Sequence, residues 1–282
     1  MRVVSEYRPS PIAGLWYQSD PQQLTLEIED YLSTAQPPEI NGKIVGLVVP
    51  HAGHRYSGAT AAYAYRTVLD QSFDTVVILS PMHKYYLQPV ITSLHSFYET
   101  PLGPVPVDRE LLTQISTKMV EKNLVPLSAV ANDDEHSVEI QLPFLQRALE
   151  GPFSLVPIML RRKDATLTQA LGSCLAELLH DRRALLIAST DLSHFYTLGQ
   201  AFELDQNMLA QIKAFSPEGV LRAEETETGF ACGVGAVAAM LAAARIMGAT
   251  DVEILNYSTS ADQTGDPASV VGYGAAAVYQ RS

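Results

Sequence analysis

Cysteine and basic residues are scarce in this chain. Only Cys174 and Cys232 occur in 282 residues, too few for a disulfide framework, so we expect a reducing, cytoplasmic location. The 19 Lys and Arg residues stand against 31 Asp and Glu, and the formal net charge is −12. This balance disfavours nucleic acid and anionic membranes as partners. The densest basic cluster is residues 161–163, which we interpret as an exposed turn.

Long apolar segments are also missing. No run approaches the length of a membrane span, and the first residues lack the apolar core of a signal peptide, so we expect no membrane partner. A hydrophobic content of 47% with 18% charged residues is typical of a globular protein with a sizeable core. No repeat or long polar linker divides the sequence, so we predict one domain over residues 1–282.

Short apolar runs alternate with helical patterns along the chain. Runs at residues 44–49, 76–79, 154–160 and 184–190 are typical of strands buried on both faces of a mainly parallel sheet. Further strands are predicted near residues 253–257 and 269–279. Helices are predicted at residues 21–32, 57–69, 108–121, 136–149, 165–180, 201–215 and 233–247. This order predicts an α/β fold, a three-layer α/β/α sandwich with a mainly parallel central sheet.

Three of these runs lead into a histidine. His51, His83 and His194 each follow the end of a predicted strand. Ligands of such sheets bind outside the carboxyl ends of the strands, so we expect the three imidazoles at one edge, around a metal ion or a substrate. The alternative is that each histidine caps its strand or faces solvent. In the loop after the first strand, we interpret His51 as a metal ligand and His54 as a pocket wall or a solvent-facing residue.

Two further segments carry ionisable groups. Asp191 precedes His194 and either fixes the tautomer of that imidazole, as suits a general base or acid, or caps the following turn. His136 lies in the acidic segment 132–139, which we predict to be mainly a solvated helix start. Glu139 follows three residues later, so both side chains are expected on one side of that helix, with a functional His136 as the less favoured alternative.

The two cysteines have different sequence contexts. Cys174 lies in an amphipathic helical pattern and is predicted to be inert core. Cys232 lies in a glycine-flanked loop before the helix at residues 233–247, where a helix N-terminus is expected to lower the pKa of the thiol. A nucleophilic Cys–His pair and a metal site of two imidazoles and one thiolate both remain open.

Eight motifs in order make the chain similar to the Memo family, whose prokaryotic members are called AmmeMemoRadiSam system protein B. They lie at residues 8–17, 50–58, 80–83, 100–108, 136–144, 189–194, 231–233 and 257–274. Two departures occur: Ser80 and Met82 in the motif that ends at His83, and His54 where an aromatic residue is common.

The resemblance implies a fold similar to that of class III extradiol dioxygenases, which hold non-haem Fe(II) with two His and one Glu. The metal positions match His51, His83 and Cys232, so that a thiolate replaces the Glu. His194 matches the acid–base histidine, and Asp191 and His136 line the same pocket. Because thiolate is a soft ligand, we expect one transition-metal ion, iron or copper before zinc.

Three functional hypotheses follow. The first is a metal-dependent oxidoreductase acting on a small molecule. The second is a binding module that recognises a peptide or protein partner, as animal Memo proteins are associated with phosphotyrosine peptides. The third, a hydrolase with Cys232 as nucleophile and His194 as base, leaves His51 and His83 without a role. We expect the apolar helix at residues 233–247 to be buried; its exposure would indicate the interface of a homo-oligomer.

Overall fold

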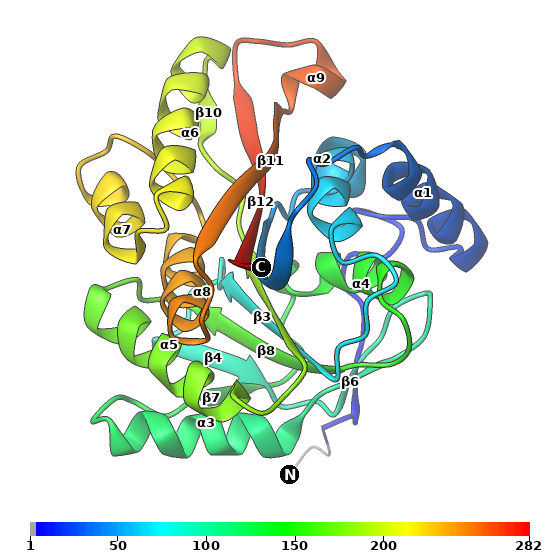
Figure 1. Ribbon diagram of the computed structural model, residues 1–282. Helices are drawn as coiled ribbons and strands as arrows, with labels where there is room; N and C mark the ends of the chain where they lie inside the picture. The colour runs from blue at the N-terminus through cyan, green and yellow to red at the C-terminus, as the bar shows by residue number, and fades with distance from the viewer. Residues whose placement is uncertain (1–3) are drawn as a thin grey trace.

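A mixed sheet lies at the centre of the computed structural model, which describes residues 4–282 (Figure 1). Within these residues the sheet has nine strands in the order β10-β12-β2-β9-β3-β8-β4-β7, with β11 paired to β12. Its strands are β2 (Gly42–Val49), β3 (Thr75–Pro81), β4 (Val90–Ser93), β7 (Ser128–Val130), β8 (Ser154–Leu160), β9 (Ala184–Ser189), β10 (His194–Tyr196), β11 (Asp251–Thr259) and β12 (Val270–Arg281). A second, small sheet joins β1 (Tyr7–Arg8), β5 (Phe97–Tyr98) and β6 (Val105–Pro106).

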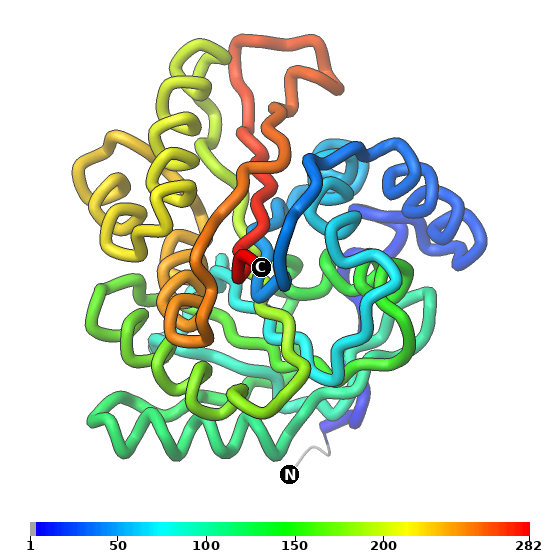
Figure 2. The backbone as a smooth tube through the Cα atoms, viewed as in Figure 1, coloured from blue at the N-terminus to red at the C-terminus, as the bar shows by residue number. Residues whose placement is uncertain are grey.

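The four central strands explain the unbroken apolar runs. β2, β9, β3 and β8 pair in parallel, and every residue of β3 and β9 is buried. Strands covered on both faces have no solvent side on which polar residues would alternate. The predicted parallel arrangement is therefore confirmed for the centre of the sheet. Antiparallel pairs flank it, and Figure 2 shows one of them, in which the C-terminal β12 lies beside β2.

Helices cover both faces of the sheet, as predicted (Figure 1). One layer contains α8 (Val234–Ile246), α5 (Ala165–Leu179), α6 (Leu198–Lys213), α7 (Pro217–Glu225) and α3 (Arg109–Glu121), and the other contains α1 (Pro21–Thr34), α2 (His54–Arg66) and α4 (Leu142–Ala148). A short helix, α9 (Ala261–Thr264), precedes β12. Ten of the thirteen α8 residues are buried, so the expectation of a buried apolar helix is confirmed.

Two of the helices that begin at other positions than predicted, α2 and α4, adjoin the histidines. α2 begins at His54, because Gly53 serves as its N-cap and lies outside the helix. The helix predicted from His136 begins only at Leu142, where Pro143 occupies the first turn and its missing N–H removes no hydrogen bond. A single 3₁₀ turn (Glu139–Gln141) precedes it, and His136 lies in a loop. The predicted helical pairing of His136 with Glu139 is therefore wrong.

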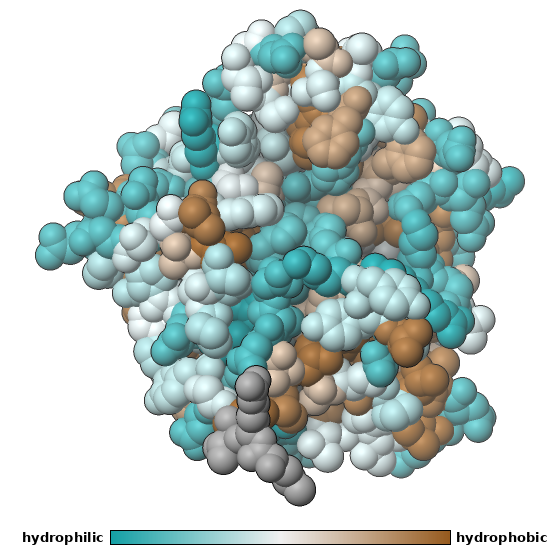
Figure 3. All heavy atoms as spheres, turned by 180° about the vertical axis from the view of Figure 1, so that it is seen from behind, coloured by the Kyte–Doolittle hydropathy of each residue, from teal (hydrophilic) through white to brown (hydrophobic). Residues whose placement is uncertain are grey.

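Polar residues dominate the face shown in Figure 3, with smaller hydrophobic groups between them. Among the helices of residues 4–282, none combines the length and apolar character needed to cross a bilayer.

Cys174 is fully buried in α5, as predicted for a core residue.

Candidate metal centre

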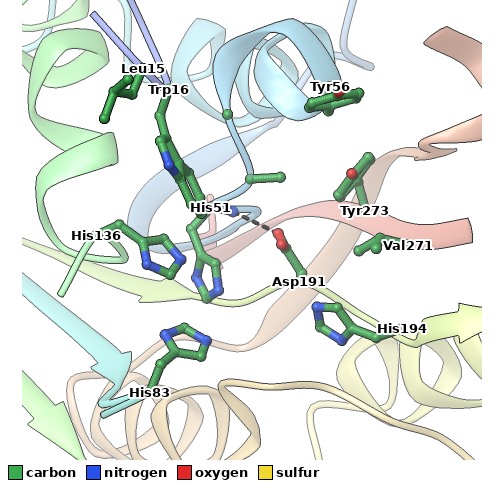
Figure 4. Close-up of a pocket in the computed structure, with 12 residues that line it drawn as sticks. Leu15, Trp16, His51, Tyr56, His83, His136, Asp191, His194, Val271 and Tyr273 are labelled. Carbon is green, nitrogen blue, oxygen red and sulfur yellow. Dashed lines mark hydrogen bonds between the residues drawn. The ribbon is translucent and has the colours of Figure 1, made fainter. Parts of the chain in front are cut away.

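A pocket of about 390 Å³ lies at the carboxyl ends of β2, β3 and β9 (Figure 4). Side chains from six separate segments line it: Leu15, Trp16, His51, Tyr56, His83, His136, Asp191, His194, Val271 and Tyr273. The structure thus brings together all three strand-end histidines predicted from the sequence, together with Asp191 and His136. Cys232 borders this group without lining the pocket itself.

Three imidazoles converge within this pocket. One ring nitrogen from each of His51, His83 and His136 lies within 4.8 Å of the other two, a spacing that suits a single metal ion. The rings of His83 and His136 stack with centroids 4.7 Å apart, and His51 stands nearly perpendicular to both (Figure 4). Cys232 lies outside this set, with its Sγ 3.1 Å from His51 Nε2. The donor atoms therefore fit a transition metal, with His136 as a candidate that the sequence favoured less.

Hydrogen bonds fix the tautomer of His51. The Ser189 hydroxyl donates to the Ser137 carbonyl at 2.7 Å, so towards His51 Nδ1, 3.0 Å away, this hydroxyl acts as an acceptor. Nδ1 of His51 therefore carries the proton, and Nε2 keeps its lone pair. Gln141 Nε2 also donates to Ser189 Oγ at 2.9 Å and holds the hydroxyl in place. Burial, together with His136 and His83, lowers the pKa of His51 well below its usual value, which favours this neutral ligand form.

Glu135 orients His83. Its two carboxylate oxygens accept hydrogen bonds from His83 Nδ1 at 2.9 Å and from the His83 backbone N–H at 2.6 Å. A carboxylate behind an imidazole fixes its orientation and leaves Nε2 available to a metal ion. Burial opposes ionisation of Glu135, but the hydrogen bond and charge of His83 prevail and hold its pKa below the usual range. For His83, burial lowers the pKa, but the hydrogen bond and charge of Glu135 outweigh burial, so the pKa of His83 is raised.

His136 completes the cluster from the loop before α4. Trp16 packs against its ring with centroids 4.2 Å apart, and Nδ1 lies 3.4 Å from Glu135 Oε1. Burial lowers the pKa of His136 to about 4, with Glu135 opposing and the charge of His83 assisting. The ring is therefore neutral at pH 7 and suited to bind a cation.

The expected pairing of Asp191 with His194 is wrong. Asp191 Oδ1 instead accepts the backbone N–H of His51 at 2.7 Å (Figure 4), and within residues 4–282 no hydrogen bond joins its carboxylate to the His194 ring. Asp191 also caps no helix, because β10 follows it. Burial raises its pKa to about 7 against the backbone hydrogen bonds of His51 and Ala52. Burial and the charge of His83 lower the pKa of His194, which lines the pocket as a neutral imidazole.

The predicted low pKa of Cys232 is also wrong for the metal-free protein. Burial and the negative charge of Asp191 raise the pKa of the thiol, and these effects exceed that of the adjacent helix N-terminus. The Asp191 backbone N–H donates to Sγ at 3.2 Å. Because Nε2 of His51 carries no proton, the Cys232 thiol donates a hydrogen bond to that nitrogen, with Sγ and Nε2 3.1 Å apart. Metal binding would have to displace this proton.

Most of the acidic segment 132–139 is buried, so the prediction of a solvated helix start is wrong. Asp133, Glu135 and Glu139 are each at most 6% exposed, and Arg8, itself 1% exposed, joins them. Its guanidinium donates to Asp133 Oδ1 at 2.8 Å, to Glu139 Oε2 at 2.6 Å and to the Glu135 carbonyl at 2.6 Å. Arg8 thereby fixes the loop that supplies Glu135 and His136. The sequence gives no signal for this burial, because residues 132–136 are uniformly polar and their partner Arg8 lies more than 120 positions away.

His54 does not face the pocket or solvent, so both interpretations of this residue are wrong. It is 2% exposed, and its ring packs edge-on against Phe144 with centroids 5.0 Å apart. Nδ1 lies 3.3 Å from Glu27 Oε1 without the geometry of a hydrogen bond. The extra histidine therefore belongs to the packing between α2 and its neighbouring helices.

Fold and site together define an α/β sandwich protein with a cluster of imidazoles at its strand ends. Residues 8–277 match the model of a family described as Memo-like protein. A MEMO1 family protein of Methanopyrus kandleri is 35% identical over 284 residues, covering 97% of this chain and 99% of that protein. One of Nitrosopumilus maritimus is 31% identical, with 95% and 98% covered. The chain belongs to the Memo family.

A solved structure supports the fold. An uncharacterized protein of Escherichia coli K12 superimposes with a TM-score of 0.50 at 13% sequence identity, covering 83% of this chain and 99% of that chain. At this level of identity the likeness concerns the fold alone.

Proposed function

We propose that this protein is a metal-dependent oxidoreductase that acts on a small organic molecule in the strand-end pocket. The observation that supports it most is the convergence of three imidazole nitrogens within 4.8 Å, two of them on rings whose second nitrogen is bonded by Ser189 or Glu135. Such outer hydrogen bonds are typical of metal-binding histidines. A cytoplasmic location is part of the proposal.

In this proposal one transition-metal ion, iron or copper before zinc, is held by His51, His83 and Cys232, with His136 near enough to take part. This assignment of the ligands rests on the family resemblance for Cys232 and on the pocket geometry for the imidazoles. A bound ion of this kind supplies redox and Lewis-acid chemistry. We also propose that the protein is related to the non-haem dioxygenases.

Other residues of the pocket have separate roles in this proposal. His194, neutral at pH 7, accepts a proton from a substrate hydroxyl in the pocket and returns it later. Asp191 holds the backbone of His51 in place through its 2.7 Å hydrogen bond. The rings of Trp16 and Tyr273 form part of the pocket wall.

The test is redox turnover by metal-loaded protein purified without oxygen or chelators. Oxygen uptake and substrate oxidation are measured with a panel of catechols and thiols, with His51→Ala as the metal-deficient control. We expect turnover by the wild type and none above background by the variant. Absence of turnover with every substrate, combined with peptide binding that His194→Ala weakens, would instead support the binding-module hypothesis.

A further inference from the structure

A second cavity of about 260 Å³ lies beside the metal centre, against the first turn of α8. His83 and Cys232 line it, and His83 also lines the main pocket. The opposite wall consists of residues 160–163, at the end of β8 and just after it. A molecule that occupies this cavity therefore contacts the same imidazole that faces the candidate metal position.

Positive charge gathers at this cavity in an otherwise acidic protein. Arg161, Arg162 and Lys163 line it and form the chain's densest basic cluster, while the net charge of the whole chain is −12. Arg162 pairs with Asp164 at 2.7 Å, and Lys163 pairs with Glu224. Three cations and two acidic partners leave one net positive charge at this wall.

Arg161 provides that uncompensated charge. Within residues 4–282 it forms no ion pair; its Nη1 donates to the Met82 carbonyl at 3.1 Å, and its guanidinium lies over the Tyr85 ring. Met82 directly precedes His83 in the chain, so this hydrogen bond holds the guanidinium on the same side of the cavity as His83. The guanidinium keeps further N–H groups for a ligand, in the planar fork that matches a carboxylate.

The first turn of α8 provides donors on the facing side. Gly235 and Ala236 line the cavity, and the N-cap Gly233 offers no side chain to accept from them. No acidic residue occupies this turn. First-turn N–H groups have no partner within a helix, and the dipole of this 13-residue helix adds positive potential there.

We propose that the substrate of the metal centre carries a carboxylate, which binds in this second cavity between Arg161 and the first turn of α8. The proposal rests on the proposed function, since it names the substrate class of the same site. One net positive charge balances a carboxylate monoanion, whereas a phosphate dianion would keep one of its charges uncompensated. The carboxylate end lies at Arg161, and the reacting part of the molecule extends past His83 into the main pocket.

The test uses metal-free, full-length protein and small probes followed by amide NMR signals of Gly233 and Gly235. Benzoate is compared with benzamide, its neutral isostere, and with inorganic phosphate. We expect saturable shifts with benzoate and at least about tenfold weaker binding of benzamide and of phosphate. Equal binding of benzoate and benzamide, or no saturable benzoate shift, overturns the proposal. Tighter binding of phosphate than of benzoate overturns the assignment to a carboxylate.

Variants test whether Arg161 provides the affinity for benzoate. Arg161→Gln is expected to weaken benzoate binding about tenfold and leave benzamide unchanged, whereas Arg161→Lys restores part of the loss. Arg183→Gln is the matched control, because this exposed arginine pairs with Asp74 at the opposite edge of the sheet. Equal benzoate affinity in Arg161→Gln and wild type contradicts the proposal. Because the probes bind metal-free protein, failure of metal binding or of turnover is a separate result.

Discussion

Hydrogen bonds around the imidazoles decide which ring nitrogens remain available to a metal ion. Ser189 binds Nδ1 of His51, and Glu135 binds Nδ1 of His83. Both rings therefore present Nε2. Neither contact was predictable from spacing, because Glu135 lies 52 positions from His83 and Ser189 lies 138 positions from His51.

Replacement of Glu135 tests this orientation. We expect Glu135→Gln to lower the affinity for the metal about 10–100-fold, the usual effect of removing a group behind a metal-binding histidine. Asp134→Asn is the matched control, since this neighbouring carboxylate is exposed and pairs with Lys84. Affinities come from competition with a chelator of known strength. Equal losses in the two variants would show that general charge, not the contact with His83, is responsible.

His194 is the residue that separates catalysis from binding. We expect His194→Ala to reduce turnover by roughly 10²–10⁴-fold, the usual share of general acid–base catalysis, while metal content stays at the wild-type level. Steady-state kinetics and metal analysis of the same preparation provide both readouts. Wild-type turnover in this variant would remove His194 from the mechanism.

At the scale of elements, one loop depends on a residue more than 120 positions away. Arg8, in the short strand β1, binds Asp133, Glu139 and the Glu135 carbonyl. Arg8→Gln leaves two buried carboxylates without their cation, so we expect a loss of about 3–5 kcal/mol in the free energy of unfolding. Urea denaturation measures it. Arg183→Gln, at an exposed pair, is the control with a loss below about 1 kcal/mol; a similar loss in both variants would contradict this role of Arg8.

The contact between α5 and α8 depends on a glycine. A Cβ at Gly172 would lie 2.9 Å from both the Ala239 carbonyl oxygen and the Ala243 backbone nitrogen. We expect Gly172→Ala to lower the free energy of unfolding by about 1–3 kcal/mol through overpacking. Gly199→Ala, in α6 with nothing within 4 Å of its Cβ position, should leave stability equal or raise it by up to about 1 kcal/mol. Thermal unfolding that ranks Gly199→Ala as the less stable variant would refute the packing argument.

At the scale of the whole molecule, the sequence predicted those features that depend on the local pattern of residues, namely the buried strands and the histidines at their ends. Unbroken apolar runs identified β2, β3, β8 and β9, because burial on both faces excludes polar alternation. The same pattern placed His51, His83 and His194 at one sheet edge. Long-range partners were not predictable: charge alone indicated a solvated segment at residues 132–139, and only the fold brings Arg8 to it. Burial at Cys232 likewise depends on packing that its glycine-flanked context does not reveal.

The proposed function requires a metal ion at the pocket in which His51, His83 and His136 converge. Metal content per chain, measured on protein purified without oxygen or chelators, tests this most directly. We expect one iron or copper ion per wild-type chain and a loss of stoichiometric binding in His51→Ala, in His83→Ala and in Cys232→Ser, with circular dichroism unchanged. Equal metal content in the wild type and in His51→Ala and His83→Ala, or no metal in the wild type even after loading, would contradict the account.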